Sequence, residues 1–74
     1  MELRKTFAKN LRRLRQAKGM SQEELAHRSE LDRTYISSLE RSVYSPSLDV
    51  VGKLSLALGV EVYELIVKSD LSAD

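Results

Sequence analysis

Residues 21–41 read SQEELAHRSELDRTYISSLER, and this stretch contains two helix starts in close succession. Ser21 begins an S-x-x-E capping box, in which the serine hydroxyl accepts a hydrogen bond and the glutamate bonds back to the serine N–H. Asp32 is a favourable N-cap for a second helix. Both starts also carry apolar residues at the two positions of a hydrophobic staple, namely Met20 with Leu25 and Leu31 with Ile36. The stretch therefore predicts helices over about 22–29 and 33–41, separated by a turn of three or four residues.

The sequence before this stretch predicts one longer helix over about residues 3–18. Its apolar residues recur at steps of four, four and three and so form one stripe, with Ala8 and Ala17 beside it: Leu3, Phe7, Leu11 and Leu14. Gly19 follows and supplies the left-handed residue that commonly ends a helix. This helix is expected to pack its stripe onto the two short helices.

Two more helices are predicted after the loop of residues 42–46. Pro46 and Ser47 introduce a helix over 48–58, and Gly59 ends it. Its expected apolar stripe consists of Leu48, Val51, Leu54 and Leu58. A short helix over about 62–68 follows, and residues 69–74 are expected to form a polar tail.

The length and the pattern together predict a single all-α domain over residues 1–74. A chain of 74 residues leaves room for one domain, and no stretch alternates apolar and polar residues as a half-buried strand does. The predicted fold is a compact five-helix bundle with a central helix-turn-helix.

The composition argues against several classes of protein. The chain has no cysteine and a single histidine, His27, so we expect no disulfide framework, no metal site and no cofactor. No nucleophile–base pair or phosphate loop is apparent, and we expect no enzymatic activity. Charged residues follow Met1 and no long apolar run occurs, so we expect no signal peptide, no membrane span and a cytoplasmic location.

The charges are distributed unevenly along the chain. Residues 1–41 hold ten Lys/Arg and six Asp/Glu, a net charge of +4, whereas the remainder holds two and five, a net charge of −3. Residues 4–18 contain seven basic residues and no acid. Such an asymmetry is typical of a half that binds a polyanion, although a solvated helix face explains a basic run more often.

Residues 21–41 resemble the helix-turn-helix of the Cro and phage-repressor family, also called the XRE family of bacterial regulators. The resemblance rests on Gln22 at the start of the first short helix, on Ala26 where the helices cross, and on the spacing of Leu31, Ile36 and Leu39. It extends over nearly all of residues 7–67. Size and the segment LDRTYIS are most similar to the controller proteins of restriction-modification systems. The resemblance implies a protein encoded by a bacterium or phage that binds double-stranded DNA and is associated with the nucleoid when bound.

The resemblance implies that helix 33–41 enters the major groove, which is wide enough to admit one helix. The family places Arg33 and Thr34 over base edges. An arginine can donate two parallel hydrogen bonds to guanine O6 and N7, and a threonine can offer its hydroxyl to a base or its methyl group to thymine. Ser37, one turn further on, is a third candidate for base contact.

Other residues are expected to contact phosphates, which orient the domain without reading sequence. The N-terminus of helix 22–29, with Gln22, should attract phosphates because its free N–H groups and its dipole favour anions. The remaining candidates are placed by the family pattern or by the basic run: Tyr35, Ser38, Arg41, Tyr44, Ser45, Ser47 and Arg12.

Two residues receive a structural role from the resemblance. The family pairs an arginine at the position of Arg15 with the glutamate that corresponds to Glu40, so we expect a partly buried ion pair. Glu30 and Ser42 depart from the family, which has glycine at both positions. If the left-handed conformation is kept, each non-glycine residue costs about 1 kcal/mol.

The leading hypothesis is a transcriptional regulator that acts as a homodimer on an inverted-repeat operator. The expected dimer interface is the apolar C-terminal end, formed by some of Val60, Val62, Tyr63, Ile66 and Val67, although these residues can also complete the monomer core. Because no segment remains for a sensor domain, we expect control by protein concentration without a small-molecule effector. The alternative is an antitoxin-like module that uses the same fold and the same apolar end to bind a different protein.

Overall fold

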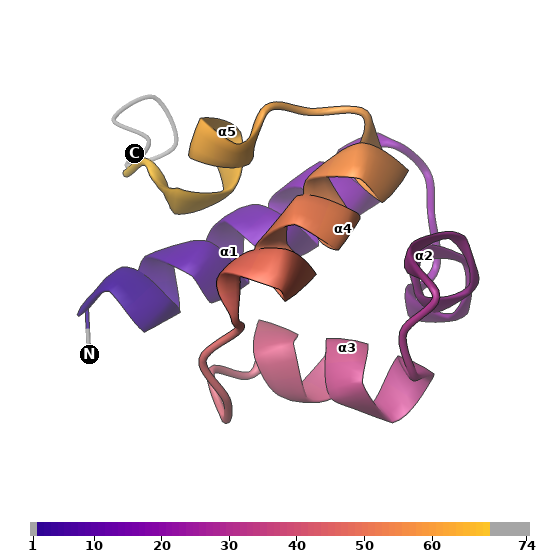
Figure 1. Ribbon diagram of the computed structural model, residues 1–74, viewed down its shortest axis with the longest axis horizontal. Helices are drawn as coiled ribbons and strands as arrows, with labels where there is room; N and C mark the ends of the chain where they lie inside the picture. Colours follow the sequence, from indigo (N-terminus) through magenta and orange to yellow (C-terminus); the bar gives the residue numbers. More distant parts are fainter. Residues whose placement is uncertain (1, 69–74) are drawn as a thin grey trace.

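The computed structural model describes residues 2–68, which form five helices. The helices are α1 (Glu2–Ala17), α2 (Gln22–Ser29), α3 (Arg33–Glu40), α4 (Leu48–Leu58) and α5 (Val62–Ile66). Figure 1 shows α4 crossing in front of α1, with α2 and α3 at one side and α5 at the other. The described part of the chain is thus the all-α bundle that the sequence predicts.

The core takes at least one fully buried residue from each helix. The side chains with less than 2% exposure are Phe7, Leu11, Leu25, Ile36, Leu39, Leu54 and Leu65. Phe7, Leu11 and Leu54 lie on the two predicted apolar stripes, and Leu25 and Ile36 occupy the predicted staple positions. Each amphipathic helix therefore buries its stripe against the others, which is the main source of stability for helices this short.

Two residues of the predicted stripes are not in the core. Leu3 is 55% exposed and Leu48 is 88% exposed. Both occupy the first turn of their helix, and Figure 1 shows the first turn of α1 extending beyond the helices packed on it. The prediction was wrong at these positions because periodicity indicates the face of a helix but not how far along it the neighbouring helices reach.

The caps that start α2 and α3 are present in part. The Ser21 hydroxyl accepts a hydrogen bond from the Glu24 N–H (3.0 Å), and the Asp32 carboxylate accepts one from the Thr34 N–H (2.9 Å). The second half of the predicted capping box is not formed, because the Glu24 carboxylate pairs with Arg28 one turn further along α2 (2.8 Å). An i, i+4 ion pair has replaced the return bond to the backbone.

Three helix ends differ from the prediction by one or two residues. α1 ends at Ala17 and α3 at Glu40, each one residue early, and α5 ends at Ile66 instead of residue 68. At the end of α5 the backbone of Val67 is extended, and Asn10 of α1 donates hydrogen bonds to the carbonyls of Leu65 (3.0 Å) and Val67 (2.9 Å). This side-chain cap stops the helix. The predicted tail 69–74 lies outside the described residues.

Glu30 and Ser42, where the resemblance implies glycine, both have left-handed backbone conformations. Their φ angles are 61° and 62°. Glu30 ends α2, and its N–H and that of Leu31 bond to the last carbonyls of the helix. The expected left-handed conformation is therefore kept at both positions, at a cost of about 1 kcal/mol for each non-glycine residue.

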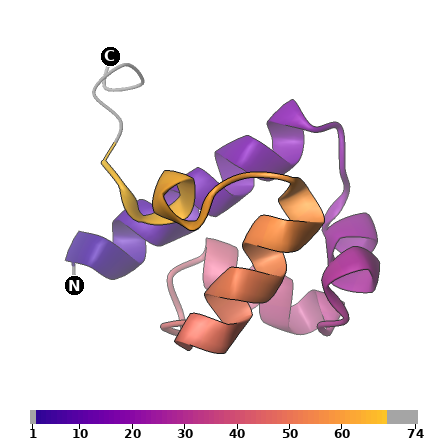
Figure 2. The ribbon, with the colours of Figure 1, turned by 45° about the horizontal axis from the view of Figure 1, so that its top comes forward.

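The arrangement places α3 at an edge of the molecule. Figure 1 shows α3 and α5 on opposite sides of α1 and α4, and Figure 2 shows from a second direction that α5 lies against α1. No helix among residues 2–68 has the length and apolar character required to cross a membrane.

Candidate nucleic-acid interface

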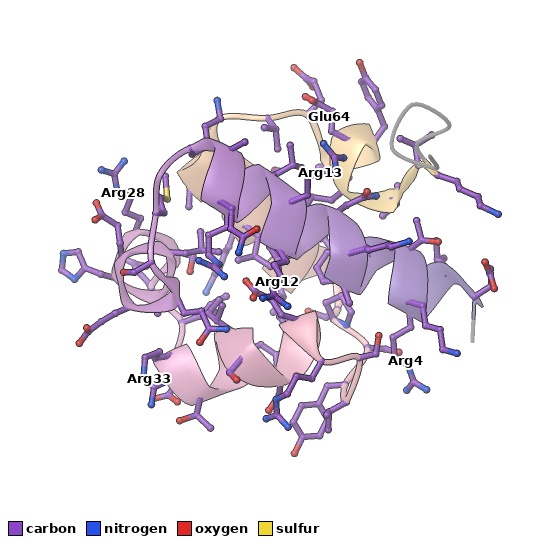
Figure 3. The ribbon with its side chains drawn as sticks, turned by 180° about the vertical axis from the view of Figure 1, so that it is seen from behind. Arg4, Arg12, Arg13, Arg28, Arg33 and Glu64 are labelled. Carbon is purple, nitrogen blue, oxygen red and sulfur yellow. The ribbon has the colours of Figure 1, made fainter. Side chains whose placement is uncertain are left out.

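The outer face of α3 begins with two exposed polar side chains. Arg33 and Thr34 are exposed, and neither side chain forms a hydrogen bond within residues 2–68. Ile36 and Leu39, on the opposite face, have no exposure and anchor the helix to the core. Figure 3 shows Arg33 at the start of α3, at the edge of the molecule. Ser37 is half-buried on the next turn. α3 thus presents its first turn outward while its rear face is held fixed.

An ion pair joins α1 to α3 behind this face. Arg15 donates from Nε and Nη2 to the two carboxylate oxygens of Glu40, at 2.6 and 3.0 Å. The third Arg15 hydrogen bond goes from Nη1 to the Met20 carbonyl (2.7 Å). Both side chains are largely buried, at 10% and 4% exposure, so the bidentate pair is shielded from water.

Gln22 is linked to the same carboxylate. Its Nε2 donates to Glu40 Oε1 (3.1 Å), which fixes the side chain at the N-terminus of α2. Glu40 therefore holds α1, α2 and α3 together through one charged group. Gln22 is half-buried, and the free N–H groups of the first turn of α2 lie beside it.

Tyr35 and Ser38 on α3, and Arg41 at its C-cap, occupy three different environments. Arg41 is exposed, whereas Ser38 is only 7% exposed and Arg41 Nη2 donates to its hydroxyl (3.5 Å). This burial favours a supporting role for Ser38 over the predicted phosphate contact. Tyr35 is half-buried against the core, and its ring centroid lies 6.2 Å from that of Tyr44.

The loop between α3 and α4 continues the exposed surface. Tyr44 is 54% exposed, and Ser45 and Ser47 are exposed as well. The Ser47 hydroxyl accepts a hydrogen bond from the Val50 N–H (3.1 Å), so it caps α4 and still has a free lone pair and its proton. A second helix N-terminus therefore opens on this surface.

The basic run of α1 lies next to α3. An open groove of about 640 Å³ is lined by residues of α1 together with residues at the end of α3. Figure 3 shows Arg12 between α1 and α3. The cationic side chains of this groove are Lys5, Lys9, Arg12, Arg13, Arg41 and Lys68.

Asn10 is the residue of structural importance that the sequence reasoning did not single out. It is 4% exposed, donates to two carbonyls at the end of α5, and accepts from Arg13 (3.2 Å). Its position one turn after Phe7 and one turn before Leu14 places it on the inner face of α1. The sequence signal that could have revealed this role is a polar residue within an otherwise apolar stripe.

The apolar C-terminal end is exposed at four of the five positions expected to form a dimer interface. Val62, Tyr63, Ile66 and Val67 are 41%, 63%, 41% and 49% exposed, whereas Val60 packs against the core. α5 lies on the side of the molecule away from α3 (Figure 1). A contact between two copies through α5 would leave α3 accessible.

No group of three or more His, Cys, Asp or Glu side chains in residues 2–68 is arranged to hold a metal ion. His27 is exposed on α2. The chemistry available at this surface is thus that of hydrogen-bond donors and positive charges.

Comparison with known proteins identifies the class. Residues 11–65 match the family described as helix-turn-helix. The chain is 46% identical over 65 residues to a hypothetical transcription factor of Neisseria meningitidis, covering 88% of this chain and 61% of that protein, so it spans less than two thirds of that relative. It is 45% identical over 65 residues to the control protein C.BamHI of Bacillus amyloliquefaciens, covering 86% of this chain and 80% of that protein.

Solved structures agree with this assignment. The restriction-modification controller protein C.AhdI from Aeromonas hydrophila superposes with a TM-score of 0.84 at 45% identity, covering 88% of this chain and 98% of that chain. The controller protein C.Esp1396I, solved as a tetramer in complex with its natural 35 base-pair operator, gives a TM-score of 0.83 at 32% identity, covering 89% and 91% of the two chains. The chain belongs to the XRE-type helix-turn-helix family of transcriptional regulators. Controller proteins are among its relatives.

Proposed function

We propose that the protein is a sequence-specific regulator that binds double-stranded DNA as a homodimer on an inverted repeat. The observation that carries the proposal is the first turn of α3, where Arg33 and Thr34 are exposed and unpaired within residues 2–68 while Ile36 and Leu39 fix the opposite face in the core. A side chain that is free in the protein but held on a rigid helix can meet a base edge with little loss of entropy.

The three candidate base contacts have different chemistry. Arg33 can form a bidentate pair with guanine, which contributes about 1–3 kcal/mol of discrimination against another base. Thr34 offers a hydroxyl or a methyl group, and Ser37 offers a hydroxyl one turn further along α3. Arg33 is therefore expected to dominate specificity at one base position in each half-site.

Phosphate contacts would orient α3 in the groove. Gln22 and the first turn of α2 lie on one side of α3, and Tyr44, Ser45 and the N-terminus of α4 follow its other end. Free N–H groups at both helix starts favour phosphate oxygens. Arg12, Tyr35 and Arg41 add to this set, whereas the burial of Ser38 does not favour its inclusion.

Dimerisation is proposed through α5. One recognition helix contacts too few base pairs to define a unique site in a genome, and two half-sites about 34 Å apart multiply the discrimination. The exposed apolar side chains of α5 supply a candidate interface away from α3. The operator-bound tetramer of C.Esp1396I supports assembly of several copies on DNA in this family.

A controller role is proposed on the basis of the controller proteins among the relatives. Dimerisation would make operator occupancy depend steeply on protein concentration, so that synthesis of the protein itself is the signal. The protein would act in the cytoplasm of a bacterium, at the nucleoid when bound.

The test is selection from a random library of DNA duplexes, followed by binding measurements on the enriched site. Wild-type protein should enrich an inverted repeat, and Arg33→Ala should lose preference at one base position per half-site. Arg28→Ala, at an exposed position of α2, is the control and should keep the preference. Failure to enrich any sequence would refute the proposal. A protein that stays monomeric and captures a different protein through Val62–Val67 would support the antitoxin-like alternative.

A further inference from the structure

The outer face of α1 carries a row of positive charges that the proposed base and phosphate contacts only partly use. Lys5, Lys9 and Arg12 are exposed and follow one another at i, i+4 and i+7, so they lie on one face of the helix. They line the groove of about 640 Å³ together with Arg41 at the end of α3. The row therefore continues a surface on which one phosphate contact is already proposed.

This row has no role in holding the protein together. None of its three side chains forms an ion pair or a hydrogen bond within residues 2–68. Of the two carboxylates in the groove, Glu2 lies one turn before Lys5 on α1, and Glu40 is neutralised by Arg15. Like charges on successive turns repel one another, so the row opposes folding by a small amount. A binding partner with a complementary negative charge would explain its presence.

The position of the row fits the DNA backbone next to α3. Figure 3 shows Arg12 between α1 and α3, and Arg41, the C-cap of α3, lines the same groove. A strand of phosphates leaving α3 would meet Arg41 and Arg12 first and the two lysines afterwards. Seven residues of helix at 1.5 Å each separate Lys5 from Arg12, about 10 Å, which corresponds to the rise of about three base pairs along the duplex axis at 3.4 Å each.

We propose that Lys5 and Lys9 bind phosphates of duplex DNA outside the half-site that α3 reads. The contact is independent of sequence, because flexible ammonium groups on an exposed helix face neutralise phosphates and reach no base edge. It lengthens the stretch of DNA that each protomer covers. This inference rests on the proposed function.

The experiment compares two duplexes that contain the same core, namely the site enriched from the random library. One duplex ends at the core, and the other carries about ten further base pairs of random sequence on each side, about one helical turn. Affinity is measured for both duplexes over a range of salt concentrations. The variants are Lys5→Ala/Lys9→Ala and the control Lys18→Ala/Lys53→Ala, which removes the same charge from exposed positions outside the groove.

Wild-type protein and the control should bind the flanked duplex more tightly than the core duplex. Lys5→Ala/Lys9→Ala should bind both duplexes alike and should match wild-type affinity on the core. On the flanked duplex its plot of log K against log salt should be flatter by about 1.8 per bound protomer, since each neutralised phosphate contributes about 0.9.

Two results would overturn the inference while the proposed function stands. One is equal wild-type affinity for core and flanked duplexes, and the other is an equal loss of flanked-duplex affinity in the control. If no core is enriched in the selection, the proposed function fails and this inference falls with it. Circular dichroism of all three proteins establishes that the comparison is between folded molecules.

Discussion

Replacement of Arg15 by methionine should destabilise the protein severely. The change leaves the Glu40 carboxylate 4% exposed, with Gln22 as its remaining donor. Removing one partner of a buried ion pair costs about 3–5 kcal/mol, because the other charge stays buried without compensation. A domain of 74 residues has a free energy of unfolding of about 4–11 kcal/mol at 0.05–0.15 kcal/mol per residue. Arg15→Met should therefore remove about a quarter or more of the stability.

The double variant Arg15→Met/Glu40→Met should be more stable than either single variant. It removes both charges, so no uncompensated charge stays in the core. The Met20 carbonyl and the Gln22 amide lose their partners, at about 1 kcal/mol each, which leaves a net cost of about 2 kcal/mol. Arg28→Met, which breaks the ion pair with Glu24 at 53% and 47% exposure, is the control and should cost less than about 1 kcal/mol.

Urea unfolding followed by circular dichroism, at one protomer concentration, measures these differences. The urea midpoint should be highest for the wild type and Arg28→Met and lower for the double variant. It should be lowest for the single variants Arg15→Met and Glu40→Met. If Arg15→Met costs as little as Arg28→Met, or if the double variant loses the sum of the two single losses, the buried pair is not the coupled unit described above. DNA affinity of the double variant should stay low even where stability recovers, because Gln22 has lost the group that orients it.

Four further predictions concern other parts of the molecule. Arg41→Ala should weaken binding equally for cognate and scrambled duplexes and flatten the salt slope by about 0.9 per protomer, whereas an effect confined to one base position would make it a base reader. Glu30→Gly should raise the free energy of unfolding by up to about 1 kcal/mol and so raise the urea midpoint, because glycine adopts the left-handed conformation without strain; a lower midpoint would contradict this. Ile66→Glu should shift sedimentation toward the monomer while the circular dichroism spectrum of the folded protein stays unchanged, and a persistent dimer would exclude the α5 interface. Asn10→Ala should lower stability by about 1–3 kcal/mol, since two carbonyls at the end of α5 lose their donor, and unchanged unfolding would show that water replaces the amide.

The sequence predicts the helices well because their ends are encoded by local chemistry. Ser21, Asp32 and Gly59 act on backbone groups within a few residues, so their effect can be read without knowledge of the fold. The family resemblance supplied what local chemistry could not, above all the contact between Arg15 and Glu40, which are far apart in the chain.

Most errors of the sequence-based prediction arise where elements far apart in the chain determine the local structure. Leu3 and Leu48 are apolar residues in register, but the neighbouring helices do not extend over them. The end of α5 depends on Asn10, a residue of α1, and no property of residues 62–68 reveals it. For these residues the outcome follows from partners that only the folded chain brings together. The error at Glu24 is local instead, because Arg28, one turn further along α2, competes successfully for the carboxylate.

The separation between the two faces of α3 has an evolutionary consequence. Ile36 and Leu39 carry the packing, while Arg33 and Thr34 contribute nothing to it within residues 2–68. Mutations at the latter two positions are thus nearly free of any penalty in folding, and selection can exchange them while the scaffold stays intact. A duplicated gene could acquire a new DNA target through a few substitutions. Many regulators of this kind, each with its own target, could then coexist in one genome.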